Sequence, residues 1–155
     1  MNKQYIFDSL KMSTDFLIKK YEKFEWEPIA ELNYQHFPNN IHWQLGHILT
    51  VFELSLSFVD KNKVDIEAYN KNFGNGTKPE DWDGKEIPSV NEIVELLGTI
   101  PERLDTLTDE DLETELPEPI VGQETVRGLL ILNTMHIPLH TGKIEEMARI
   151  IRAEA

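Results

Sequence analysis

The stretch IHWQLGHILTVFELSLSFVD, residues 41–60, is the most apolar part of the chain, and its periodicity predicts a helix over this whole range. Its apolar residues repeat with the helical period on two sides. One stripe comprises Leu45, Leu49, Phe52, Leu56 and Val59, and the other comprises Trp43, His47, Val51, Leu54 and Phe58. A helix that is apolar on two sides is buried against several neighbours, so this segment favours a helical bundle.

The segment before this helix also has a helical pattern, from about residue 5 to residue 24. Its apolar stripe consists of Ile6, Leu10, Phe16 or Leu17, and Tyr21 or Phe24. The pattern breaks at Pro28 and Pro38, and Asn39 or Asn40 then supplies the N-cap of the helix that starts at residue 41. We therefore expect the first two helices to be joined by an irregular connection.

A third helix is marked by the sequence SVNE, residues 89–92, which is a capping box with Ser followed by Glu three residues later. The apolar residues of this helix are Ile93, Leu96, Leu97, Ile100, Leu104 and Leu107. Pro101 lies inside it and is expected to kink or restart it. The acidic, proline-containing stretch at residues 108–119 ends the helix. Its Asp and Glu residues at 109–115 indicate a solvated turn, because they lack the alternating ligands and central Gly of a calcium loop.

A fourth helix is predicted from Thr125, its N-cap, to about residue 152. Pro138 lies inside this segment, so the chain forms either one kinked helix or two helical pieces. The apolar phase is kept across the proline, which favours the kinked continuous helix. The residues that keep this phase, at seven-residue steps, are Leu130, Ile137 and Ile144.

The connection at residues 61–88 is polar and rich in Gly and Pro, which predicts a long crossover between the second and third helices. The sequence has no strand alternation of useful length and no internal repeat. A chain of 155 residues is long enough for one domain with its own core. We therefore predict a single all-α domain over residues 1–155, folded as a four-helix bundle.

Charge and composition exclude several classes of partner. The chain has 28 Asp and Glu against 15 Lys and Arg, a net charge of −13, which disfavours nucleic acid and anionic membranes. It has no Cys, which excludes disulfides, thiolate metal ligands and a cysteine nucleophile. The first residues lack the uninterrupted apolar core of a secretory signal, so we expect a cytoplasmic protein.

Three of the five histidines lie on apolar helices. His136 and His140 are four residues apart and share one helix face, as two imidazoles that bind one cation do. His47 lies on the most apolar helix, where a lone imidazole needs a buried partner. If the second and fourth helices face each other, the three nitrogens converge. Such a set suits zinc, nickel, iron or copper and leaves a position open for water or substrate.

The sequence resembles the DinB/YfiT-like superfamily of four-helix metal-dependent enzymes over nearly its whole length in element order. Trp43, Gly46 and His47 match the family's motif on the second helix. On the fourth helix, the matching residues are His136, His140, Gly142 and Ile144. The stretch LPEP…GQETVRGLL is similar to the family's entry to that helix, whereas Pro138 departs from the helix formers more usual there.

The resemblance implies a divalent metal bound by the histidine triad, most often zinc or nickel, with iron or manganese as alternatives. Several family members are thiol-dependent S-transferases or isomerases that use bacillithiol, mycothiol or glutathione, and members commonly form homodimers. It thus implies a small-molecule substrate, a low-molecular-weight thiol as co-substrate and a homodimer for this chain.

Each singled-out residue also has a plainer interpretation. His47, His136 and His140 could be core histidines whose hydrogen bonds are satisfied by side chains or water. His36 and His42 are expected to be exposed or to cap a helix. Trp43 is expected first to pack in the core and second to line a pocket, while Asn133 either supports the site or is a satisfied core amide.

These observations lead to a metalloenzyme hypothesis in which His47, His136 and His140 hold a divalent ion that binds water or a thiolate. With water the protein would be a hydrolase, and with a thiol it would be an S-transferase. No carboxylate falls on the ligand stripe to act as general base, which favours the thiol route. The alternative is a non-catalytic metal-binding or interaction module.

Overall fold

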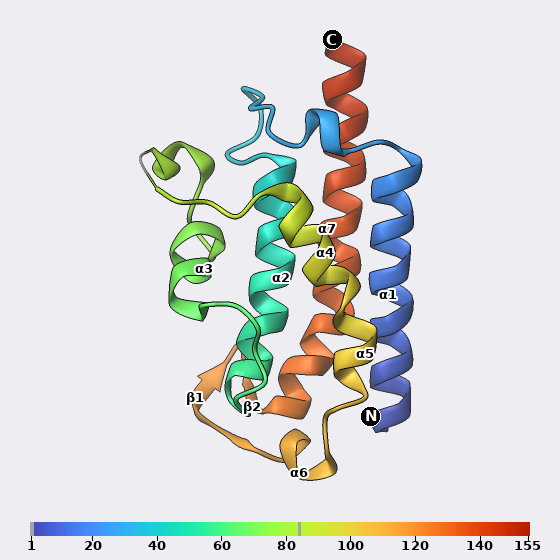
Figure 1. Ribbon diagram of the computed structural model, residues 1–155, viewed down its shortest axis with the longest axis vertical. Helices are drawn as coiled ribbons and strands as arrows, with labels where there is room; N and C mark the ends of the chain where they lie inside the picture. Colours follow the sequence, from blue (N-terminus) through green and yellow to red (C-terminus); the bar gives the residue numbers. More distant parts are fainter. Residues whose placement is uncertain (1, 84) are drawn as a thin grey trace.

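The computed structural model describes residues 2–83 and 85–155, and most of them lie in helices (Figure 1). The elements, in chain order, are α1 (Lys3–Lys23), η1 (Glu27–Ile29), α2 (Ile41–Ser57), α3 (Ile66–Phe73), η2 (Pro79–Trp82), α4 (Val90–Gly98), α5 (Ile100–Leu104), α6 (Asp109–Leu112), β1 (Glu115–Ile120), β2 (Gln123–Thr125) and α7 (Val126–Glu154). The fold is the expected all-α bundle, in which α1, α2 and α7 are the long helices and α4 with α5 makes up the fourth.

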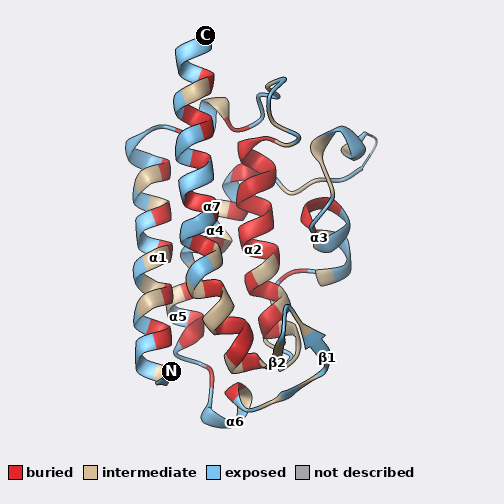
Figure 2. Ribbon diagram, turned by 180° about the vertical axis from the view of Figure 1, so that it is seen from behind, coloured by how far each residue is buried: buried red, intermediate tan, exposed pale blue. Residues whose placement is uncertain are grey.

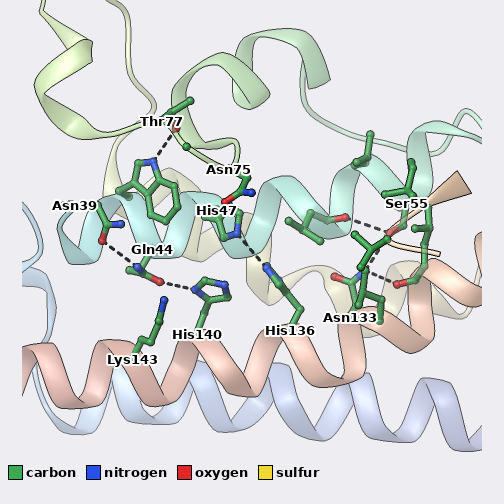
Figure 3. A pocket seen from close by; sticks show the side chains of 18 of the residues that line it. Asn39, Gln44, His47, Ser55, Asn75, Thr77, Asn133, His136, His140 and Lys143 are labelled. Atoms are coloured by element: carbon green, nitrogen blue, oxygen red, sulfur yellow. Dashed lines mark hydrogen bonds between the residues drawn. The ribbon is translucent and has the colours of Figure 1, made fainter. Parts of the chain in front are cut away.

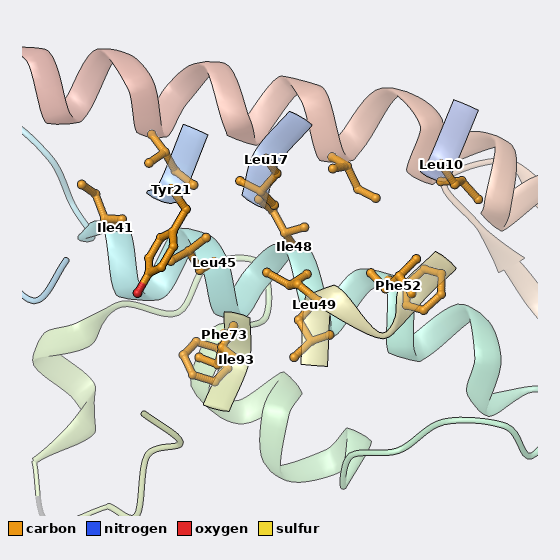
Figure 4. Packing of buried hydrophobic residues seen from close by; sticks show 14 of the residues in the cluster. Leu10, Leu17, Tyr21, Ile41, Leu45, Ile48, Leu49, Phe52, Phe73 and Ile93 are labelled. Carbon is orange, nitrogen blue, oxygen red and sulfur yellow. The ribbon is translucent and has the colours of Figure 1, made fainter. Parts of the chain in front are cut away.

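Helix α1 packs against α7 and against α4 and α5, and the Asn2 side chain caps its first turn. The two alternatives left open for its stripe are resolved, because Leu17 and Tyr21 are buried while Phe16 and Phe24 are exposed. The buried face therefore follows the spacing that a straight helix requires. Figure 4 shows Leu17 and Tyr21 lying in the core beside apolar side chains of α2.

Helix α2 is buried along nearly its whole length (Figure 2), as its two apolar stripes predict. Of the two candidate caps, Asn40 is the N-cap, and its Oδ1 accepts a hydrogen bond from the Trp43 backbone N–H at 2.8 Å. The helix ends at Ser57 rather than at residue 60, because the chain leaves it through a turn in which Asp60 has a φ of 60°. Fully burying each large apolar side chain of this helix contributes about 1.5–3 kcal/mol.

The third helix begins with the predicted capping box, in which Ser89 and Glu92 bond each other's backbone N–H. Of the two outcomes for Pro101, the restart is observed. Helix α4 ends at Gly98, and α5 starts at Ile100 with the proline in its first turn, where the missing N–H has no helical partner to lose.

The connection between α2 and α4 is the predicted long crossover, but it is more ordered than a loop. It contains the eight-residue helix α3, capped by Asp65, and the short η2. Phe73 at the end of α3 lies on α2 over Gly46, where an added Cβ would be 2.3 Å from the Phe73 ring. Gly46 is therefore the residue that allows α3 to approach α2 this closely.

The expectation that the chain has no strand is wrong, because β1 and β2 form an antiparallel hairpin before α7. Neither strand contains a buried residue, so both lack the apolar alternation by which a strand is recognised. A two-stranded ribbon also tolerates prolines, because both of its strands are edges. The turn at the tip places Val121 at φ 48° and Gly122 at φ 76°. A positive φ is ordinary for Gly and strained for a β-branched residue such as Val121.

Helix α7 begins at its predicted N-cap, where the Thr125 hydroxyl accepts from the Gly128 backbone N–H. It continues without interruption through Pro138, as the apolar phase indicates. Pro138 is exposed, so the proline ring and the lost hydrogen bond lie on the solvent side of the helix. Within residues 2–83 and 85–155, no helix is both long and apolar enough to cross a bilayer.

Candidate metal centre

The three histidines singled out from the sequence converge between α2 and α7 (Figure 3). One ring nitrogen of each of His47, His136 and His140 lies within 4.8 Å of the others. His140 is buried and His136 is half-buried, so His140 is the more inward of the pair, as its place on the apolar stripe predicts. The three could together hold a metal ion.

The orientation of His47 is set by the backbone of α3. Its Nδ1 lies 2.7 Å from the carbonyl oxygen of Phe73. A carbonyl only accepts hydrogen bonds, so Nδ1 carries the proton and Nε2 keeps its electron pair. The indole of Trp43 stacks on the same imidazole, with ring centroids 4.7 Å apart and planes 9° from parallel. His47 is therefore held on its edge and on one face.

The orientation of His140 on α7 is set by Gln44 of α2 and, through Gln44, by Asn39 just before that helix. Its Nδ1 lies 2.6 Å from Oε1 of Gln44, and the Gln44 amide nitrogen donates to Oδ1 of Asn39 at 2.9 Å. In this chain of hydrogen bonds Nδ1 of His140 is the donor, which leaves its Nε2 as an electron-pair donor. Two of the three rings thus present an unprotonated Nε2.

His136 differs from the other two because its hydrogen bonds are incomplete. Its Nε2 lies 3.1 Å from Nε2 of His47, while its Nδ1 is buried and has no partner among the described residues. One turn earlier on α7, Oδ1 of the fully buried Asn133 is also unpartnered. Buried polar atoms are nearly always paired, so these two atoms leave hydrogen-bonding capacity beside a cavity for a water or a ligand.

Burial keeps all three imidazoles neutral at pH 7. It lowers the pKa of His47, and it lowers the pKa of His136 to about 4, with the neighbouring His47 as a second cause. Burial also lowers the pKa of His140 to about 3, with His136 and His47 adding to the effect. The positive charge of Lys143 acts in the same direction on each of these three pKa values. Neutral imidazole is the form that binds metals.

A cavity of about 600 Å³ opens beside the histidines. This volume is in the range of small-molecule sites. Its described lining includes no Asp or Glu, and comprises Pro38, Asn39, Trp43, Gln44, His47, Val51, Leu54, Ser55, Asn75, Gly76, Thr77, Lys78, Ile120, Val121, Leu129, Leu132, Asn133, His136, His140 and Lys143. The loop after α3 closes one side, because Nε1–H of Trp43 donates to the Thr77 hydroxyl at 2.9 Å.

The expectations for Trp43 and His36 are confirmed, whereas Asn133 is not the satisfied core amide of one alternative. Trp43 fulfils both of its expected roles, since it is buried and also lines the cavity. The Asn133 amide nitrogen donates to Ser55 Oγ and to the Leu129 carbonyl, but its unpartnered Oδ1 means that it is not a satisfied core amide. His36 is exposed as expected.

The expectation for His42 is wrong. His42 is 4% exposed, and its Nε2 lies 2.8 Å from the Pro88 carbonyl. The chain that leads into α4 covers α2 at this point. The periodicity of α2 alone does not predict such a contact with a distant segment. His42 therefore ties two parts of the bundle together and is separate from the cluster of three histidines.

Three groups beside the histidines were not expected from the sequence, and they are Gln44, the Phe73 carbonyl and Lys143. Lys143 had a usable signal, because it lies three residues after His140 and seven after His136 on the same helix face. Gln44 had none, since a single amide on an apolar helix has many explanations. A backbone carbonyl such as that of Phe73 leaves no trace in the sequence.

The chain matches one known protein family. The model of the DinB superfamily matches residues 12–144, which include His47, His136 and His140. No curated protein matches the chain. Because the match covers most of its length, the chain belongs to the DinB superfamily.

Proposed function

We propose that this DinB superfamily chain is a divalent-metal-dependent enzyme in which His47, His136 and His140 bind the ion. The observation that carries the proposal is the convergence of three neutral imidazoles from two helices within 4.8 Å. Two of their Nδ1 atoms already donate to fixed acceptors, which is the usual arrangement of metal-binding histidines. The structure thus supports a preformed set of nitrogen ligands.

The spacing and chemistry of the donors fit a small divalent ion. Two nitrogens bound tetrahedrally to zinc at about 2.0–2.1 Å are about 3.3 Å apart. The 3.1 Å between Nε2 of His47 and Nε2 of His136 is close to that value. Without an ion or a proton, two electron pairs would face each other across this distance. Imidazole ligands suit zinc, nickel, iron or copper. Among these and manganese, the family resemblance favours zinc or nickel.

When bound, the ion would lower the pKa of a coordinated water or thiol, so that it reacts as an anion near neutral pH. The residues of the chain would orient the ligands and limit the access of water, as Trp43 does on one face of His47. The described cavity lining offers no carboxylate to take a proton from water. This favours transfer of a low-molecular-weight thiol to a small electrophile over hydrolysis.

The competing function is a non-catalytic module in which the ion only ties α2 to α7. Structural zinc sites are closed by four protein ligands, whereas three histidines are the only Cys, His, Asp or Glu side chains gathered here in the described part of the chain. A cavity of about 600 Å³ lies beside them. Both features favour an open coordination position and therefore an enzyme.

Replacing His140 by Ala tests the ligand set. Two remaining histidines on different helices are too few to hold the ion, so zinc binding measured by calorimetry should be lost while far-UV circular dichroism stays unchanged. The matched control is His36→Ala, an exposed histidine whose loss should leave zinc affinity as it is. Full zinc occupancy in His140→Ala would refute the proposed ligand set.

A second measurement separates enzyme from structural site. Cobalt substituted into the cluster reports its coordination by visible absorption, and an open position should show a spectral change when a small thiol is added. A structural site should show none. Turnover is then sought by incubating the zinc or nickel protein with small thiols and electrophiles, with the His140→Ala variant as the blank.

A further inference from the structure

The cavity beside the histidines has two ends of different chemistry. Helices α2 and α7 run in opposite directions, so the start of α2 lies beside the later part of α7 (Figures 1 and 3). Asn39, Gln44 and Lys143 lie together at that end, and the three histidines follow in the middle. Apart from Pro38, which lies next to Asn39, the carbon-only side chains of the lining come from the later part of α2, the early part of α7 and the β1–β2 hairpin, and they are Val51, Leu54, Ile120, Val121, Leu129 and Leu132.

The polar end of the cavity is positive in a strongly negative protein. None of the chain's 28 acidic residues is among the described residues of the lining. Lys143 forms no ion pair within the described residues, and the nearby Glu146 on its helix is already paired with Arg149 at 2.5 Å. The second lysine of the lining, Lys78, is neutralised by Glu80 at 2.7 Å. The charge of Lys143 is therefore available to a ligand.

Lys143 is also directed toward the cavity rather than away from it. Its positive charge lowers the pKa of all three histidines. Figure 3 shows its side chain extending from α7 toward Gln44. Gln44 bonds His140 through its amide oxygen and Asn39 through its amide nitrogen, and the described residues include no hydrogen bond between Gln44 and the ammonium group of Lys143. This end offers a cation without a bound anion.

The apolar end is closed by the tip of the β1–β2 hairpin. Val121 is 74% exposed although it is a large apolar residue, and it lines the cavity in a left-handed conformation with φ 48°. Strained residues of this kind persist where the position serves a purpose other than stability. Asn or Gly would relieve the strain in this turn, yet neither would present an apolar side chain to the cavity.

From these two ends we infer that the cavity binds an amphipathic anion, with its anionic group at Lys143 and its apolar part against the Val121 hairpin tip. The inference rests on the proposed function, because the reactive part of such a substrate would then lie at the three histidines. It deepens that proposal by assigning the substrate a polarity and an orientation. Along α2, Gln44 and Leu54 are about 15 Å apart at 1.5 Å per residue, which suits a chain of medium length.

The polar end is tested with octanoate as the probe, by calorimetry on the zinc-loaded full chain and on the same chain with chelator. Octanoate should bind in both states, and octylammonium should not bind. Lys143→Gln should weaken octanoate binding about three- to tenfold, as expected for loss of one exposed charge partner. The matched control is Lys19→Gln, an exposed lysine that does not line the cavity.

The apolar end is tested by Val121→Asn, which keeps a residue suited to the turn and removes the apolar side chain. The preference for octanoate over butanoate should fall about three- to tenfold, as expected for loss of a few buried methyl groups. Thermal unfolding of the variant should occur at the same or a higher temperature, so a weaker preference cannot be ascribed to misfolding.

Several outcomes would overturn the inference. Octanoate affinity unchanged in Lys143→Gln, equal binding of octylammonium, or a tail-length preference unchanged in Val121→Asn would each do so. Binding that disappears with chelator would show that the ion alone holds the carboxylate. The proposed function fails by a different result, namely full zinc binding in His140→Ala, so the two failures are distinguishable.

Discussion

Helix α2 contributes one residue to each of two polar clusters, Glu53 to the first and His47 to the second. The two clusters differ in how completely their atoms are paired. In one, the Arg103 guanidinium donates to both carboxylate oxygens of Glu53, at 2.5 and 2.9 Å, and to the Lys61 carbonyl at 3.2 Å. The Lys63 backbone N–H adds a further bond to Glu53 at 2.9 Å. In the other, which lies between α2 and α7, His136 Nδ1 and Asn133 Oδ1 have no partner in the described part of the chain.

The difference separates a closed cluster from the one that we propose binds a metal ion. The Glu53–Arg103 pair is closed, because each charge is met by the other and by backbone groups that cannot leave. The histidine cluster opens onto a cavity, and its pairing is incomplete within the described residues, since only Nε2 of His136 has a partner there, which is Nε2 of His47. Buried polarity alone therefore does not mark the site, whereas incomplete pairing beside a cavity does.

The largest effect is expected where the closed cluster is broken. Arg103→Ala leaves Glu53 buried and uncompensated, which should destabilise the fold by about 3–5 kcal/mol. Urea unfolding measures the loss. The double variant Glu53→Leu/Arg103→Leu should recover most of it, because no unpaired charge remains. If Arg103→Ala were as stable as the parent, the pair would not be the closed unit described.

Gly46→Ala should have an intermediate effect that reaches the open cluster. The added methyl would meet the Phe73 ring, so overpacking should cost about 1–3 kcal/mol. Phe73 also supplies the carbonyl that orients His47, so zinc affinity should fall about 10- to 100-fold, as for other groups that orient ligands.

The matched control for Gly46→Ala is Gly142→Ala. A Cβ at Gly142 meets nothing within 4 Å, and the residue is exposed within α7. Alanine there should leave zinc binding unchanged and raise stability by about 0.5–1 kcal/mol. Equal zinc affinities for the two variants would show that the contact between Gly46 and Phe73 does not affect metal binding.

Acid should weaken the histidine cluster in the metal-free protein. The pKa of His136 is about 4 and that of His140 about 3 in the fold, against an ordinary value of 6.5. Between these pKa values the unfolded chain binds more protons than the folded chain. The contribution of the two neutral imidazoles to the free energy of unfolding is therefore complete above pH 6.5 and is lost as the pH falls. The unfolding midpoint should therefore drop more between pH 7 and pH 5 in the parent than in His136→Ala. Equal drops would contradict the shifts.

The smallest effect is expected at the hairpin tip. Val121→Asn should stabilise the metal-free protein by about 1 kcal/mol, because Asn adopts a positive φ more readily than Val. Differential scanning calorimetry measures the gain. A destabilised variant would mean that the Val121 side chain contributes packing which its 74% exposure does not suggest.

The bundle and the three histidines could be predicted from the sequence for the same physical reason. Apolar periodicity specifies which face of a helix is buried, and a histidine on a buried face stands out because it needs a partner. The N-caps Asn40 and Thr125 were also within reach, since a capping side chain bonds its own helix start. Local rules of this kind require no knowledge of the rest of the fold.

What could not be predicted depends on contacts between distant segments. The burial of His42 follows from its bond to Pro88, and the orientation of His47 follows from the Phe73 carbonyl. Helix α3 is short and the hairpin is exposed, so neither has the length or alternation that periodicity needs. Both help to enclose the cavity, which is why the sequence indicated the ligands but not the shape of the site.

The large separation of His47 from His136 along the chain has a consequence for metal binding. His47 and His136 are 89 positions apart along the chain, and closing a loop of that length in an unfolded chain costs about 4 kcal/mol of entropy. An unfolded chain would therefore offer the ion little more than the local pair on α7. The folded bundle brings all three histidines together, so zinc binding should raise the free energy of unfolding, whereas a chelator that enters through the cavity can reach the ion without separating α2 from α7.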